Sequence, residues 1–172
     1  LLDAVQKFWT LDGMVIVGPG MPGVIHYCGA DLIHTGVSLC MSQERYIKDV
    51  LQRVGLKESN IASTPMDNNV FEQVAEETKK NKGIVPDKTL VNEAQTLVGC
   101  IIWVATRTRP DVIFAMSVAA SIMTSLPALS IKLSKRVLRY LKGTVALCLV
   151  FGQVPNGVLL TNLSLIHISE PT

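Results

Sequence analysis

The second half of the chain has almost no negative charge. Between Val112 and Ser169 there is no aspartate or glutamate. The lysines and arginines of this stretch are Lys132, Lys135, Arg136, Arg139 and Lys142. The net charge of the whole 172-residue chain is only +2, so the charges are unevenly distributed along the chain although they nearly balance overall. Such a distribution favours a polyanionic partner.

Cysteine patterns that bind metal or form a disulfide framework are also missing. The four cysteines, Cys28, Cys40, Cys100 and Cys148, include no CxxC pair, and no histidine lies at metal-ligand spacing from them. We therefore expect reduced thiols in an intracellular protein of the cytoplasm or nucleus.

Long apolar runs and a targeting signal are absent as well. The two most apolar runs, residues 97–105 and 112–123, are each too short to cross a bilayer. We therefore expect no membrane partner. The N-terminus opens Leu-Leu-Asp with no basic region and no initiator Met, so we expect a cut there and no signal peptide.

Hydrophobic residues make up 48% of the chain, which is ample for a core. Apolar periodicity predicts four helices, at residues 42–54, 90–105, 110–124 and 131–142. Pro110 begins the third of these helices, and Pro127 ends it. Short strands are predicted at residues 14–17, 24–27, 37–40 and 145–151. Residues 57–88 are polar and predict a long loop with one short helix near 71–78. The predicted class is α+β, with short N-terminal strands, a mainly helical region, a C-terminal strand and an incomplete domain.

Two patterns imitate functional sites. Gly18, Gly20 and Gly23 form GxGxxG, but a dinucleotide site needs a helix after the third glycine, and the β-favouring residues 24–27 follow instead. His26 and His34 flank Asp31, but this spacing places no pair on one helical face and brings no further ligand. We interpret the first as a flexible turn and the second as surface residues.

Four stretches occur in an order typical of one family. Residues 41–56 read MSQERYIKDVLQRVGL, residues 62–66 ASTPM, residues 97–115 LVGCIIWVATRTRPDVIFA and residues 135–144 KRVLRYLKGT. Together they resemble the SQ helix, the STPM segment, the TRPDI turn and the RYLKGT helix of copia-type long-terminal-repeat retrotransposon Pol polyproteins. The resemblance covers residues 24–151.

The resemblance implies the part of the polyprotein that follows the polymerase palm, similar to the thumb and connection that lead into RNase H. The family's catalytic aspartates lie in a Tyr-x-Asp-Asp turn, which this sequence lacks. Residues 26–31 resemble instead the family's HYFLGIE strand. The resemblance therefore implies an inactive segment with no catalytic residue. The intact family enzyme uses Mg²⁺, but we expect this segment to have no metal or cofactor of its own.

The resemblance also suggests a division of the chain. Residues 1–23 are left unassigned, as sequence of frameshifted or intron origin. Residues 24–151 are assigned to a reverse transcriptase thumb/connection-like fragment, and residues 152–162 to the truncated start of an RNase H-like region. We expect residues 163–172 to be a sequencing-adapter artefact and the remainder of the polyprotein to be missing.

The basic residues recur at spacings of three and four, so they share one face of the predicted helix at 131–142. One interpretation is contact with the phosphates of an RNA–DNA template-primer, through Lys132, Lys135, Arg136, Arg139 and Lys142. The alternative is a solvated amphipathic face. The resemblance to a template-handling region favours the first.

A second basic group, Arg107 and Arg109, surrounds the turn that contains Pro110 and Asp111. The arginines either contact nucleic acid or stabilise the turn, where Pro110 fixes φ and Asp111 favours the helix N-terminus and pairs with an arginine. We favour the structural interpretation.

The sequence therefore predicts a non-catalytic remnant of a retrotransposon RNA-directed DNA polymerase, with template-primer contact through a basic helix. Two alternatives stay open. One is a small helical nucleic-acid-binding module unrelated to polymerases, and the other is a pseudogene product that is never expressed.

Overall fold

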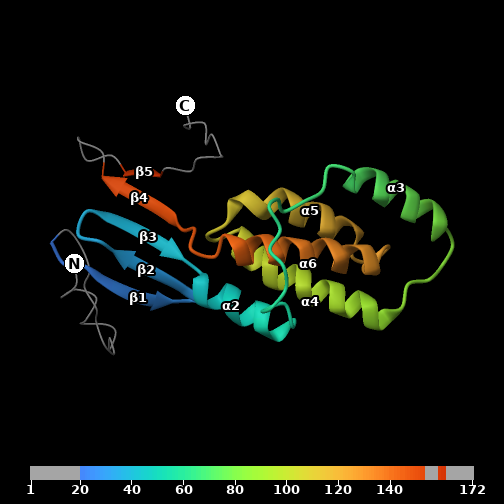
Figure 1. The fold of residues 1–172 in the computed structure, drawn as a ribbon, viewed down its shortest axis with the longest axis horizontal. Coiled ribbons are helices and arrows are strands. Elements are labelled where there is room, and N and C mark those ends of the chain that lie inside the picture. Colours follow the sequence, from blue (N-terminus) through green and yellow to red (C-terminus); the bar gives the residue numbers. More distant parts are fainter. Residues whose placement is uncertain (1–19, 154–158, 162–172) are drawn as a thin grey trace, which may run out of the picture.

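The computed structural model describes residues 20–153 and 159–161. An antiparallel sheet lies at one end of the long axis and a helical bundle at the other (Figure 1). This arrangement confirms the α+β class. The predicted strand at 14–17, most of segment 1–23 and all of segment 163–172 lie outside the described residues.

The sheet has five antiparallel strands in the order β1-β2-β3-β4-β5. Their bounds are β1 Gly23–Tyr27, β2 Ala30–His34, β3 Ser38–Ser42, β4 Leu149–Gln153 and β5 Leu159–Thr161. Tyr27 pairs with Ala30 across a two-residue turn in which Cys28 and Gly29 both have positive φ, 48° and 74°. A tight hairpin of this kind needs that conformation at both positions. Because Gly23 begins β1 and no helix, the GxGxxG pattern has no helix N-terminus behind it.

The helices are α2 Glu44–Arg53, α3 Val70–Lys80, α4 Lys88–Ala105, η1 Pro110–Val112, α5 Ile113–Ile122 and α6 Pro127–Gly143. The sequence suggested that Pro127 ends the preceding helix, but α5 already ends at Ile122. Pro127 is instead the first residue of α6, which begins four residues before the predicted start at Ile131. Proline is favoured at that position because the N–H of the first helical residue has no intrahelical partner anyway. Within the described ranges, no helix is both long enough and apolar enough to cross a bilayer.

The core lies between α2, α4, α5 and α6. The buried apolar side chains on the inner faces of these helices include Ile47, Val50, Leu51, Ala94, Leu97, Ile101, Ala115, Met116, Ala119, Leu133, Val137, Leu138 and Leu141. Small residues allow α5 and α6 to approach closely, and the buried Ser130 hydroxyl donates to the Ala119 carbonyl at 2.8 Å. The core therefore orients α6, leaving its other face for the basic residues.

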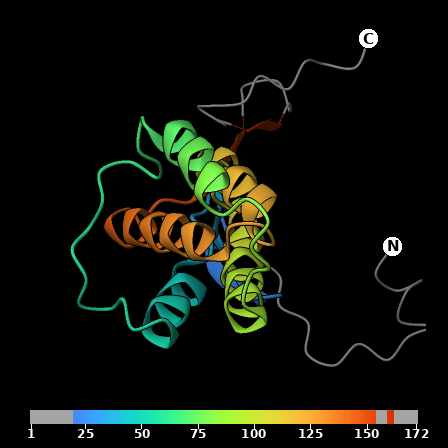
Figure 2. The ribbon, with the colours of Figure 1, turned by 90° about the vertical axis from the view of Figure 1, so that its right-hand side faces the viewer.

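Residues 57–69 form most of the connection between α2 and α3 and have no regular secondary structure. In Figure 2 this segment runs outside α6, on the side away from α5. We call it the strap. It lies beside the helix that carries the five basic residues.

Candidate nucleic-acid interface

The turn between α4 and α5 is held to the end of α6 by Arg109. This arginine is 2% exposed and forms two hydrogen bonds with Asp111, from Nε to Oδ1 at 2.9 Å and from Nη2 to Oδ2 at 2.7 Å. It also donates to the backbone carbonyl and the hydroxyl of Thr144, at 2.8 and 2.7 Å. The guanidinium is thus used inside the molecule and is not presented to a ligand.

Tyr140 completes this cluster, since its hydroxyl donates to Asp111 at 3.0 Å. Burial tends to raise the pKa of Asp111, but the hydrogen bonds and charge of Arg109 and the bond from Tyr140 outweigh it, so the pKa lies below its usual value. Burial and the adjacent Asp111 carboxylate raise the pKa of Tyr140. The cluster joins the residues 106–111 turn to the residues 135–144 helix.

A further buried contact brings in the segment that begins α2. The Thr108 hydroxyl donates to Oε1 of Gln43 at 2.9 Å, and both residues are buried. Three of the four motif segments therefore meet at one place, although they are far apart along the chain.

Arg107 lies outside this cluster. It is exposed, and its guanidinium carbon stands 4.3 Å from the centre of the Trp103 ring. Pro110 opens the 3₁₀ turn η1, with Asp111 inside its first turn. The structure therefore places Arg109, Pro110 and Asp111 in a helix-start arrangement and leaves Arg107 on the surface.

The five basic residues of α6 lie along the part of the helix that the core does not cover, and we call this the basic face. Lys132 is exposed, and the other four are half-buried. The charge of Lys132 contributes to lowering the pKa of Glu77 on α3, after the larger effect of Lys80. Lys135 is 3.5 Å from Glu93 of α4. Exposed interactions of this kind are weak, so the ammonium groups of Lys132 and Lys135 remain free to interact with another anion.

Arg136 and Lys142 are engaged by the strap. Nη2 of Arg136 is 2.8 Å from Asp67 Oδ1 and donates to the Thr64 hydroxyl at 3.0 Å. Lys142 donates to the Ser59 carbonyl at 2.6 Å. The structure therefore brings all five basic residues to one helix but gives two of them partners on the strap, which the sequence did not predict.

A groove beside the basic face adds one residue that sequence reasoning missed. Lys135 lines it together with Arg53 of α2 and with Asn92 and Thr96 of α4. No periodicity in the sequence relates α2 to α6, so only the packing of the bundle reveals that Arg53 and Lys135 share this surface.

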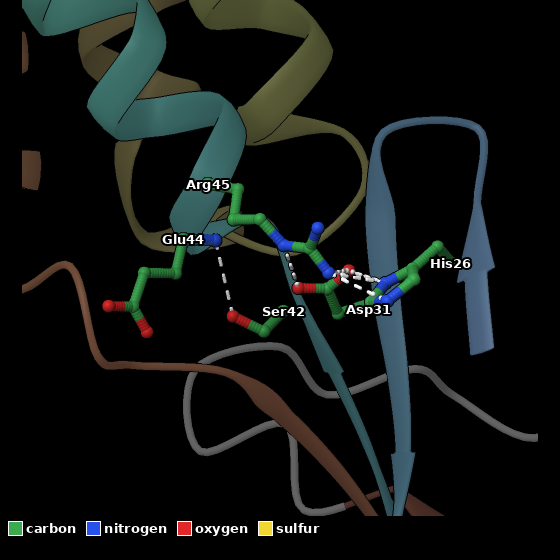
Figure 3. Close-up of polar contacts among 5 residues, drawn as sticks. All are labelled: His26, Asp31, Ser42, Glu44 and Arg45. Atoms are coloured by element: carbon green, nitrogen blue, oxygen red, sulfur yellow. Dashed lines mark hydrogen bonds and ion pairs between the residues drawn. The ribbon is translucent and has the colours of Figure 1, made fainter. Parts of the chain in front are cut away.

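His26 and Asp31, part of the rejected metal pattern, form a different cluster with Arg45 (Figure 3). Asp31 accepts hydrogen bonds from Nε and Nη2 of Arg45, both at 3.1 Å, and is hydrogen-bonded to His26. Partial burial tends to raise the pKa of Asp31, but these two partners lower it below its usual value. His34 makes a separate contact: its Nδ1 accepts a hydrogen bond from the Gly36 amide at 3.0 Å. Among the residues that the structure describes, no group of three metal-ligating side chains comes together.

The same close-up shows the start of α2. Ser42, the last residue of β3, accepts a hydrogen bond from the Glu44 amide at 3.2 Å (Figure 3). The sequence predicted a helix from residue 42; α2 begins at Glu44 with Gln43 at the cap position, and the Ser42 hydroxyl satisfies an amide of the first turn.

Comparison with known proteins finds relatives over most of the chain. It is 32% identical over 120 residues to the retrovirus-related Pol polyprotein from transposon TNT 1-94 of Nicotiana tabacum, a match that covers 69% of this chain and 9% of the relative. It is 32% identical over 124 residues to an uncharacterized mitochondrial protein of Arabidopsis thaliana, covering 72% of this chain and 48% of that protein. The chain spans less than half the length of both relatives. No family model matches, and no solved structure gives a significant match. With its motif segments joined in one fold and its relatives named in this way, the chain belongs to the family of copia-type retrotransposon Pol polyproteins.

Proposed function

We propose that this chain is the segment of a retrotransposon reverse transcriptase that follows the polymerase palm, and that it contacts the RNA–DNA template-primer through the basic face of α6. The observation that carries the proposal is the gathering of Lys132, Lys135, Arg136, Arg139 and Lys142 on one helix. No acidic residue lies on that helix to neutralise them. Such a surface binds phosphates irrespective of base sequence.

A helical nucleic-acid-binding module without polymerase ancestry was the alternative. The two interpretations predict the same phosphate contacts. The relationship to a Pol polyprotein favours the polymerase segment, because the relative's name assigns it to a retrovirus-like element. The contact itself is what the experiment must test.

The test is fluorescence anisotropy of a labelled RNA–DNA hybrid over a salt series. The variant changes Lys132, Lys135 and Arg139 to Gln, and it spares Arg136 because that residue also holds the strap. Removing one cation from the phosphate backbone makes the log-log salt slope shallower by about 0.9, so we expect a change of roughly two to three units.

The matched control removes the same number of charges from scattered positions: Lys48 of α2, Lys79 of α3 and Lys88 of α4, all to Gln. We expect its slope to stay close to that of the parent. If the two triple variants change the slope equally, or if the parent does not bind at low salt, the proposal is wrong.

The proposal includes the absence of polymerase chemistry. A polymerase holds two metal ions with carboxylates at the primer end, and the acidic residues of the described ranges form no cluster that fits them. In the intact family enzyme, Mg²⁺ and its aspartates would belong to another part of the polyprotein. We expect no template-dependent extension of a primed template with Mg²⁺ or Mn²⁺, measured by gel; nucleotide incorporation would contradict this.

A further inference from the structure

The strap is attached at both ends and is at most half-buried between them. Leu51 of α2 and Val70 at the start of α3 are buried in the core, whereas no residue from 57 to 69 is buried. A segment with little buried apolar surface opens locally at a lower free-energy cost than the helices on either side.

The polar contacts of the strap are made with the basic face. Asp67 and Thr64 provide oxygen acceptors to Arg136, and the Ser59 carbonyl accepts from Lys142. A phosphate group offers the same chemistry, with negatively charged oxygens that accept from guanidinium and ammonium groups. The strap therefore occupies two of the five cations in the way that a nucleic-acid backbone would.

Arg136 is not fully satisfied by the strap. Its Nε is buried and has no hydrogen-bond partner among the described residues. A buried donor without a partner raises the free energy of the closed arrangement. A planar guanidinium binds a phosphate through two parallel N–H groups, so a phosphate can satisfy what the strap leaves unpaired.

The remaining attachments are apolar contacts and one backbone hydrogen bond, and the half-buried Met66 packs against the core. Ile61 is 66% exposed and lies over Gly143, where an added Cβ would come within 3.3 Å of the isoleucine Cβ. The Ala62 amide donates to the Arg139 carbonyl at 3.3 Å, a long hydrogen bond. These contacts place the strap against α6 and the core without fully burying any of its residues.

We propose that the strap is an intramolecular competitor of nucleic acid: it holds Arg136 and Lys142 in the free chain and is displaced when a phosphate backbone binds α6. This inference rests on the proposed function. It divides the basic face into two sets. The side chains of Lys132, Lys135 and Arg139 form no hydrogen bond or ion pair with the strap among the described residues, whereas Arg136 and Lys142 become available when the strap opens.

The test combines binding with hydrogen–deuterium exchange of strap peptides, using the full chain and a labelled RNA–DNA hybrid. Asp67→Asn keeps the shape of the side chain and removes its charge. Glu58→Gln is the matched control, because Glu58 lies in the strap and forms no ion pair within the described residues. We expect Asp67→Asn to bind about two- to five-fold more tightly, the range of a partly exposed ion pair, and to speed strap exchange in the free chain. Glu58→Gln should leave strap exchange unchanged.

In the parent, adding the hybrid should speed exchange at residues 57–69, because the strap leaves the helix. The competitor role is overturned if the hybrid binds while strap exchange stays unchanged or slows, or if the two variants behave alike. Absence of binding by the parent and by Asp67→Asn at low salt would instead overturn the proposed function itself. Binding by Asp67→Asn alone would support the competitor role.

Discussion

Arg107 and Arg109 are two residues apart in one turn and have opposite environments. Arg107 is exposed and stacks on Trp103, whereas Arg109 is buried and pairs with Asp111 and Thr144. A buried guanidinium needs acceptors in place of water, and the carboxylate, carbonyl and hydroxyl around Arg109 accept from all three of its nitrogens.

We therefore expect the two arginines to differ strongly as determinants of stability. Arg109→Ala should lower the free energy of unfolding by about 3–5 kcal/mol, because it leaves the Asp111 charge without its partner. Arg107→Ala should cost no more than about 1 kcal/mol, the size of an exposed cation–π contact. Urea-induced unfolding of both variants measures the difference. Equal losses would show that Arg109 does not have the role assigned to it.

The ionisation of Asp111 makes the free energy of unfolding depend on pH in the acidic range. Its pKa in the folded chain lies below the unfolded value, so its contribution is fully present above the unfolded pKa and is lost as the pH falls through the folded pKa. Compared with Asp111→Asn, the parent should be more stable at pH 7. That advantage should shrink below about pH 4, by at most about 1.4 kcal/mol per pH unit for one proton. Thermal unfolding across pH 2–7 tests this, and an advantage that stays constant to pH 2 would contradict it.

At the scale of elements, the close packing of α5 on α6 depends on small side chains. Ala115 and Ala119 of α5 and Ser130 and Ser134 of α6 are all buried, and the Ser130 hydroxyl bonds the Ala119 carbonyl. A larger side chain at this interface must push the helices apart, because a packed core has few voids.

Ala119→Leu should therefore destabilise the chain by about 1–3 kcal/mol, the usual cost of overpacking. Ala120→Leu, one residue along α5 and only half-buried, is the control and should cost less. Chemical denaturation provides both values. If the two variants are equally stable, α5 and α6 do not pack as closely as the structure has them.

Periodicity predicts α2, α4 and α5 to within a few residues, because each has an apolar stripe and a clear start or stop residue. It misses β2, where Leu32 and Ile33 are adjacent and the strand shows no alternation. It also begins α6 too late, because Pro127 marks either the end of one helix or the start of the next. Only tertiary packing decides such cases.

At the scale of the whole molecule, the sequence identifies the basic face but not its surroundings. The spacing of the basic residues predicts that they share a side of one helix, and the structure has them on α6. The strap contacts of Arg136 and Lys142, and the nearness of Arg53 to Lys135, join residues tens of positions apart. A single sequence contains no signal for such contacts.

The four segments shared with the family contact one another in the fold. The turn at residues 106–111 bonds to the end of α6 through Arg109, and to the start of α2 through Thr108. The strap, with its Thr64, bonds to α6 through Arg136. The four segments are therefore parts of one interlocked fold, with the basic face on its outer side.

Contact between the accessible part of this basic face and a nucleic-acid backbone is the central claim. Lysine acetylation with and without an RNA–DNA hybrid, quantified by mass spectrometry at low salt, tests it most directly. We predict that the hybrid protects Lys132 and Lys135, that protection disappears at high salt, and that Lys48 and Lys88, on other helices, react equally in both conditions. Equal reactivity of all four lysines under conditions in which the hybrid is bound would contradict the claim.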